Sequence, residues 1–145
     1  MIIRNITDFL NETLDRCNRL NLNPRYTYLF GSAPAYIFGY TTNPPNDFDF
    51  IVPQVVWTDL ARRIRPVKST TLGTLTIKAG PDVEIFNKTG FEPKITVTEM
   101  IKKSIIVRGV TLVDIGCMVR WWSLSARKKD LEKVAMVLKG KKGVK

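Results

Sequence analysis

Apolar residues at the start of the chain recur at the spacing of an amphipathic helix. Between Ile6 and Leu20 they fall at nearly every third or fourth position, with Asn5 or Thr7 available as the N-cap. The run from Tyr26 to Phe30 is short, apolar and closed by Gly31. This pattern predicts a helix followed by a buried strand.

The middle of the chain alternates between short helical and extended patterns. The short apolar segment Ala33 to Tyr40 is consistent with a helix that starts at the glycine turn, and an apolar stripe at helical spacing covers Val55 to Ile64. The aromatic segment Asp47 to Val52 between them is typical of a strand. Two further strands are predicted, a half-buried one at Thr74 to Lys78 and another at Asp82 to Phe86.

The last third of the chain has mainly helical signals. Thr96 and Glu99 have capping-box spacing, and a longer helical pattern runs after Gly109 to Leu138, with Gly140 as its stop. The expected architecture is therefore α/β (α+β): a small mixed sheet of about four strands flanked by helices, with C-terminal helices. We expect one domain over residues 1–138 and a basic, disordered tail over residues 139–145.

Composition excludes several classes of protein. No apolar run approaches the ~18 residues of a membrane span, and no signal-peptide pattern opens the chain, so we expect a cytoplasmic protein without membrane contact. Cys17 and Cys117 are far apart and match no metal spacing, which favours buried thiols over a disulfide. The chain has no histidine, which excludes His-ligated zinc and Ser–His or Cys–His catalysis.

The charge of the chain favours an anionic partner. Its 23 basic and 13 acidic residues give a formal net charge of +10. Such an excess attracts nucleic acids or nucleotides through their phosphates, although a basic surface can also serve solubility alone. Only four of the basic residues fall in the predicted tail, so the body of the protein is basic as well.

Carboxylates recur at a spacing of two on two predicted strands. Asp47 and Asp49 share one face, about 7 Å apart, because residues i and i+2 of a strand point the same way. Asp82 and Glu84 repeat the pattern on the next strand but one. Such pairs on neighbouring strands would repel without a cation between them, and Mg²⁺ prefers oxygen ligands. The alternative interpretation is an exposed sheet face or an edge guarded by charge.

Gly31 and Ser32 stand at the predicted strand-to-helix turn. Glycine lets the backbone approach a ligand closely, and the serine adds a hydroxyl donor. A helix that begins here would present free N–H groups to a phosphate. The pair is common in turns, and it gains meaning from the Asp-Phe-Asp strand that follows.

Together these motifs resemble the nucleotidyltransferase superfamily typified by DNA polymerase β. The matching segments are Phe30-Gly31-Ser32, Asp47-Phe48-Asp49-Phe50 and Val83-Glu84-Ile85. The segment Arg127-Lys128-Lys129-Asp130-Leu131, with Arg120 before it, is similar to helices of small stand-alone members, including those of abortive-infection and toxin–antitoxin systems. The gap between Ser32 and Asp47 is longer than usual for the family, through Asn43-Pro44-Pro45.

The resemblance implies a role for each matching residue. Asp47 and Asp49 would bind two Mg²⁺ (or Mn²⁺) ions, and Glu84 would share the ion that activates the attacking hydroxyl, with Asp82 as its rival. The other implied roles concern the nucleoside triphosphate: Gly31 and Ser32 would hold its phosphate tail, and Arg120 and Lys129 would face its phosphates.

The predicted function is transfer of a nucleoside monophosphate from an NTP to an acceptor hydroxyl, with release of pyrophosphate. The acceptor could be RNA or DNA, a protein or a small molecule. The alternative is a non-catalytic nucleic-acid-binding module that stacks bases on Trp121, Trp122 and Tyr40, although paired tryptophans in an apolar helix are more often core. A third hypothesis is that the protein depends on a partner chain for its function or forms a homo-oligomer.

Overall fold

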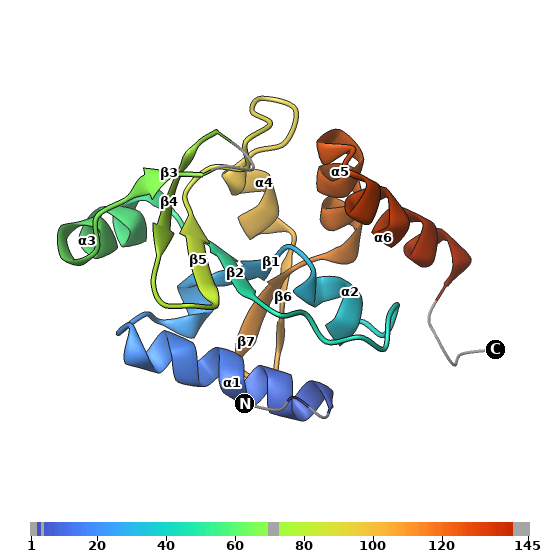
Figure 1. Ribbon diagram of the computed structural model, residues 1–145, viewed down its shortest axis with the longest axis horizontal. Coiled ribbons are helices and arrows are strands. Elements are labelled where there is room, and N and C mark those ends of the chain that lie inside the picture. The colour runs from blue at the N-terminus through green and yellow to red at the C-terminus, as the bar shows by residue number, and fades with distance from the viewer. Residues whose placement is uncertain (1–2, 4, 70–72, 141–145) are drawn as a thin grey trace.

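Strands form one mixed sheet at the centre of the computed structural model, which describes residues 3, 5–69 and 73–140 (Figure 1). The strands are β1 (Tyr28–Phe30), β2 (Phe48–Ile51), β3 (Val67–Lys68), β4 (Leu75–Lys78), β5 (Val83–Phe86), β6 (Ser104–Val107) and β7 (Val110–Val113). Within the described residues the sheet has seven strands in the order β3-β4-β5-β2-β1-β7-β6. Two of its pairings, β2 with β5 and β1 with β7, are parallel.

Helices precede and follow the strands along the chain. They are α1 (Ile6–Arg19), α2 (Ala33–Ile37), α3 (Gln54–Arg63), α4 (Val97–Lys102), α5 (Ile115–Ser125) and α6 (Lys128–Lys139), with a 3₁₀ turn, η1, at Pro24–Tyr26. The predicted caps are confirmed. The Asn5 side chain accepts from the Asp8 N–H at 2.8 Å, that of Thr96 from Glu99 N–H at 3.2 Å, and α6 ends at Gly140.

The α/β class is confirmed, but the prediction of about four strands is wrong. The segment between α4 and α5, whose flanking signals suggested helix, forms the hairpin β6–β7. Its residues are mainly Val, Ile and Thr, which favour strands. Arg108 and Gly109 both have positive φ, 49° and 84°, as a two-residue hairpin turn requires. The helix predicted after Gly109 therefore begins only at Ile115, and it breaks at Ala126 (φ 56°).

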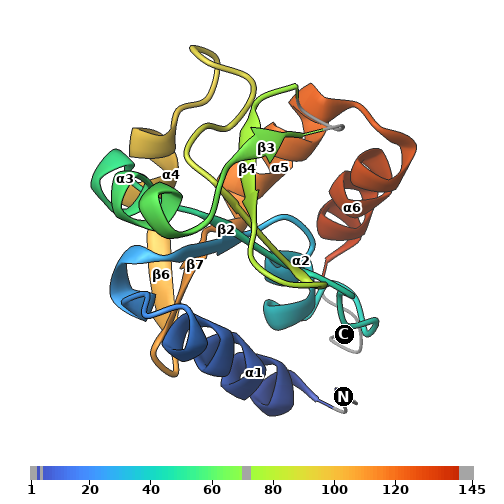
Figure 2. The same ribbon diagram turned by 60° about the vertical axis from the view of Figure 1, so that its left-hand side comes forward.

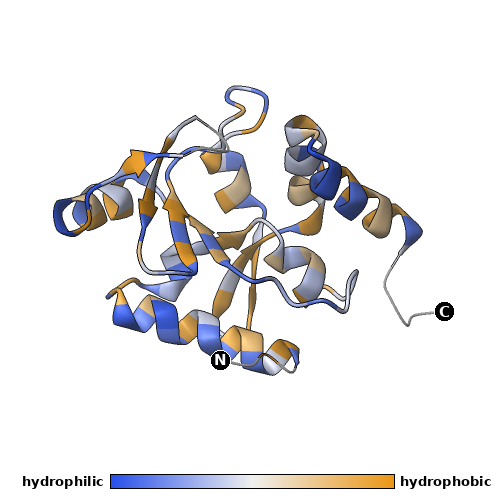
Figure 3. Ribbon diagram, in the orientation of Figure 1, coloured by the Kyte–Doolittle hydropathy of each residue, from blue (hydrophilic) through white to orange (hydrophobic). Residues whose placement is uncertain are grey.

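The sheet separates two apolar clusters, as the alternation along its strands requires. Phe48 and Phe50 of β2 face α1 and α3, where the Phe9 and Phe48 rings stack 4.9 Å apart. The cluster on the other face, which includes Ile51, packs against α4 and α5. Figure 2 shows α1 on one side of the sheet and α5 and α6 on the other, and Figure 3 shows hydrophobic strands between helices with hydrophilic outer faces.

Three further expectations concern the whole chain. Cys17 and Cys117 are free and buried in different clusters, as predicted, and burial raises the pKa of the Cys17 thiol to about 12. None of the described helices combines the length and apolar character needed to cross a membrane. Lys139 of the predicted tail is the last residue of α6, and the rest of the predicted tail beyond Gly140 lies outside the described residues.

Candidate functional site

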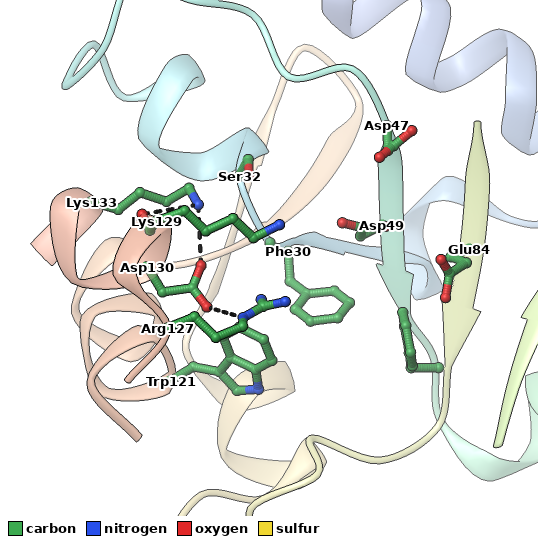
Figure 4. A pocket seen from close by; sticks show the side chains of 12 residues that line it. Phe30, Ser32, Asp47, Asp49, Glu84, Trp121, Arg127, Lys129, Asp130 and Lys133 are labelled. Carbon is green, nitrogen blue, oxygen red and sulfur yellow. Dashed lines mark hydrogen bonds and ion pairs between the residues drawn. The ribbon is translucent and has the colours of Figure 1, made fainter. Parts of the chain in front are cut away.

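Three predicted site carboxylates lie on one face of the sheet, toward α5 and α6 (Figure 4). β2 and β5 run parallel with Asp49 opposite Glu84, and β1 runs antiparallel to β2 with Phe30 opposite Asp49. Asp47 directly precedes β2 and is exposed, whereas Asp49 and Glu84 are partly buried. The parallel pairing of β2 with β5 thus brings together acids from two distant motifs.

Gly31 supports Asp49 from the neighbouring strand end. Its φ of +74° is one that residues with a side chain rarely adopt. A Cβ atom built on it would lie 2.8 Å from Asp49 Oδ2 and 3.3 Å from Asp49 Cβ. The glycine is therefore needed both for the turn after β1 and for the space that the aspartate occupies.

Asp49 is the most strongly perturbed acid of the site. Burial, together with the charges of Glu84 and Asp47, raises its pKa to about 7, although Lys129 and Arg127 act to lower it. These cations are too distant to form an ion pair with it, since Asp49 has neither a salt bridge nor a side-chain hydrogen bond with the described residues. The site therefore has an excess of negative charge that a cation would stabilise.

The donor set suits a hard divalent cation, although its geometry does not enclose one. No group of three or more acidic, Cys or His side chains among the described residues is arranged to hold a metal ion, and the three carboxylates do not converge on a point in Figure 4. Mg²⁺ is commonly held by one or two carboxylates, with waters and substrate phosphates completing its shell. Asp47, Asp49 and Glu84 are the residues that could hold it in this way.

A cavity of about 180 Å³ extends from these carboxylates to the C-terminal helices. Gly31 and Ser32 line it on one side, and Arg127, Lys129 and Lys133 line it on the other. Phe30, Phe86 and Trp121 lie at its apolar end. The side chain of Lys129 makes no hydrogen bond or ion pair with the residues described, and in Figure 4 it extends toward the carboxylates.

Asp130 holds two of the cations in place from beneath the cavity. Its side chain is 2% exposed, and its carboxylate accepts from Ser125 Oγ, from Arg127 Nε at 2.8 Å and from Lys133 Nζ at 3.2 Å. Burial alone would raise the pKa of Asp130, but these hydrogen bonds outweigh it and lower the pKa. Arg127 and Lys133 were not predicted as site residues. They stand three residues before and three residues after Asp130, which places all three on one helical face. This spacing is the feature of the sequence from which they could have been predicted.

Two residues predicted for the site make their contacts elsewhere. Arg120 donates to Glu99 on α4 at 2.7 Å and to the Lys94 carbonyl at 2.7 Å, and it does not line the cavity. Asp82 lies just before β5 and pairs with Arg16 of α1, with Nη2 and Oδ2 2.6 Å apart.

Asp82 lines a small cavity with Asp47, Asp49 and Glu84, but its carboxylate is held by the ion pair with Arg16. The Arg16 guanidinium lies 4.1 Å from the centroid of the Phe48 ring, which belongs to the opposite face of the sheet. Glu84 instead accepts from the buried Thr76 hydroxyl at 3.2 Å and stands beside Asp49. The geometry therefore favours Glu84 over Asp82 as the third carboxylate.

Ser32 lines the cavity, but the helix after it offers little further help to a phosphate. α2 has only five residues, and Pro34 in its first turn has no N–H. The Ser32 side chain makes no capping bond. Phosphate contacts at this end would therefore rest on the Ser32 hydroxyl and on the cations of α6.

The paired tryptophans are core residues, as their pattern favoured. Trp122 is fully buried and Trp121 is 3% exposed, with its Nε1–H donating to the Thr89 carbonyl at 2.9 Å. Neither offers an exposed ring for base stacking. A surface that binds nucleic acid through these two rings is therefore not supported.

Comparison with models of protein families, with curated proteins and with solved structures finds no match to this chain.

Proposed function

We propose that this protein is a metal-dependent nucleotidyltransferase that moves a nucleoside monophosphate from an NTP to an acceptor hydroxyl. The observation that carries the proposal is the position of Asp49. It lies between Gly31 and Glu84 on the sheet, and it faces a cavity whose opposite wall carries Arg127 and Lys129. Anionic and cationic walls that face each other across a cavity suit a triphosphate that binds together with divalent cations.

Each side of the site has its own task in this proposal. Asp47 and Asp49 hold Mg²⁺ or Mn²⁺, which would stabilise the attacking and leaving oxygens of an in-line displacement. Ser32, Arg127 and Lys129 bind the phosphates that leave as pyrophosphate. Glu84 stands on the far side of Asp49 from Lys129 (Figure 4), so the acceptor hydroxyl approaches from its side.

The direct test is label transfer from each α-³²P-labelled NTP in Mg²⁺ or Mn²⁺, with total cellular RNA, DNA, protein and small metabolites offered as acceptors. We expect label in one acceptor fraction, equimolar release of pyrophosphate, and loss of both when EDTA removes the metal. Metal-independent nucleic-acid binding without turnover of any NTP would instead favour the binding-module alternative.

Neighbouring lysines of α6 offer a matched comparison. Lys129 lines the cavity, whereas the exposed Lys128 does not. We expect Lys129→Gln to lower kcat/KM for the NTP by about tenfold, because one charge-assisted phosphate contact is lost. Lys128→Gln removes the same charge and should change kcat/KM less than about twofold. Equal losses in both variants would mean that only the overall charge matters.

A further inference from the structure

A second, larger cavity opens from the same carboxylates in another direction. Its volume is about 360 Å³, within the range of pockets that bind small ligands. It lies between the loop of residues 41–46 and α6, and it shares Ser32, Asp47, Asp49, Lys129 and Lys133 with the first cavity. The unusually long gap between Ser32 and Asp47 thus forms one wall of a cavity beside the site.

The two cavities differ in chemistry. The first alone has Gly31 and Arg127, besides Ser32 and the two lysines that both cavities share. The second adds Pro44, Pro45 and Met136 as apolar walls, with Asn43 and Asn46 as neutral polar groups. Phosphates suit the first cavity, and a nucleoside, with its flat apolar faces and polar edge, suits the second.

Glu132 is the carboxylate that the second cavity does not share with the first. It is exposed and, despite several lysines on the same helix, makes no hydrogen bond or ion pair within the described part of the chain. A carboxylate repels phosphate but accepts hydrogen bonds from sugar hydroxyls, as acidic residues do in dinucleotide-binding sites.

The order of residues along α6 matches the order of groups in a nucleotide. Lys129, Glu132 and Met136 follow one another at intervals of three and four residues, so all three lie along one side of the helix, within about 11 Å. All three line the second cavity. A cation, a hydrogen-bond acceptor and an apolar side chain in this order correspond to phosphate, ribose and base.

We propose that the second cavity binds the nucleoside of the substrate, and that Glu132 selects ribonucleotides by accepting hydrogen bonds from the ribose hydroxyls. The inference rests on the proposed function and adds the sugar class of its substrate. The base, held by Met136 and the two prolines through apolar contact, contributes affinity with little discrimination among bases.

Calorimetric titration with α,β-methylene ATP and its 2′-deoxy counterpart tests the role of Glu132. Neither analogue can be cleaved between its α and β phosphates, so binding is measured without transfer. In Mg²⁺ we expect the ribose form to bind about tenfold tighter to the wild type, as for one hydrogen bond to a charged acceptor. Glu132→Ala should reduce this ratio to within about twofold. The ratio is the readout because removing a negative charge strengthens phosphate binding for both analogues alike.

Two matched variants sharpen the result. Asp59→Ala removes an acidic side chain that is 71% exposed on α3 and lines neither cavity, so it should keep the tenfold ratio. Met136→Ala should weaken both analogues by the same factor of about three. Circular dichroism of each variant verifies its fold.

The outcomes separate the two proposals. Binding of both analogues with equal affinity to the wild type, or a ratio that Glu132→Ala leaves unchanged, overturns the role of Glu132 while the proposed transferase stands. Unchanged affinities of both analogues for Met136→Ala would show that the nucleoside does not bind in this cavity. Failure of the wild type to bind either analogue in Mg²⁺ overturns the proposed function and this inference together.

Discussion

Replacing Asp49 by asparagine is expected to abolish nucleotide transfer while stabilising the metal-free protein at pH 8. Under the proposed function, transfer should fall by at least about 10³-fold, because the amide cannot supply the negative charge that would hold the divalent cations. The stability gain arises because burial, Glu84 and Asp47 all disfavour the Asp49 carboxylate. We expect a gain of about 2 kcal/mol in the free energy of unfolding.

The same residue predicts how stability changes with pH. The folded-state pKa of Asp49, about 7, lies above its value in an unfolded chain, so the protonated side chain favours folding at low pH. That contribution is lost as the pH rises through 7. In EDTA, wild-type stability should therefore fall from about pH 4 to 7 and level off above pH 7, and the asparagine variant should lack this contribution. The chain has no histidine to obscure this window.

Urea unfolding followed by tryptophan fluorescence measures the stability, and label transfer measures the activity. Asp59→Asn, an exposed residue paired with Arg63, is the control and should change neither quantity appreciably. Full activity of the Asp49 variant would end the assignment of this residue as a metal ligand. A variant less stable than the wild type at pH 8 would show that the charged Asp49 carboxylate does not destabilise the folded protein.

Gly31→Ala is expected to have the second largest effect, on both stability and activity. The new methyl group would meet Asp49 Oδ2 at 2.8 Å, and the positive φ is itself unfavourable. We expect a loss of about 3 kcal/mol in unfolding free energy. We also expect at least about a 10²-fold fall in transfer, because Asp49 must move away from its position beside Glu84.

Gly73 separates the two causes. Its φ of +71° is nearly that of Gly31, but a Cβ atom there would meet no atom of the described residues within 4 Å. Gly73→Ala should therefore cost only about 1 kcal/mol of backbone strain and leave transfer unchanged. Equal losses in the two variants would show that the space beside Asp49 is unimportant.

The sequence allowed the acidic half of the site to be predicted because its rules are local. Asp47 and Asp49 share a face through the period of a strand, and Gly31 ends β1 as its position suggested. The partner of Asp49 depends on which strands become neighbours. Only the parallel pairing of β2 with β5 sets Glu84 beside it and leaves Asp82 to Arg16 of α1.

The cationic half was harder to predict because of one backbone break. On a continuous helix Arg120 and Arg127 would face the same way, since residues seven apart lie on one side. The left-handed Ala126 instead divides the segment into α5 and α6. As a result Arg127 lines the cavity while Arg120 contacts α4. An alanine gives no local sign of such a turn, because positive φ is rare for it.

Around Arg108 the β-branched residues favoured strands, but no clear turn signal marked the segment as a hairpin. Type I′ turns favour Asn or Asp before glycine, and the arginine conceals the pattern. In edge strand β6 the neighbouring residues Ile105 and Ile106 are both exposed, so the strand does not alternate clearly between buried and exposed positions. The count of strands was therefore underestimated at this edge of the sheet.

The parallel partnership of β1 with β7 has a consequence for synthesis on the ribosome. Tyr28 pairs with Thr111, roughly eighty residues later. When β5 has emerged, one edge of β1 still has no neighbour. At 5–20 residues per second it waits roughly 1–5 s until β7 follows. During that interval the nascent chain presents a hydrophobic strand edge that a chaperone can bind. The acids of β2 and β5 likewise precede the cations of α6 in the chain. The charges of the site therefore become balanced only after the last strand of the sheet has been made.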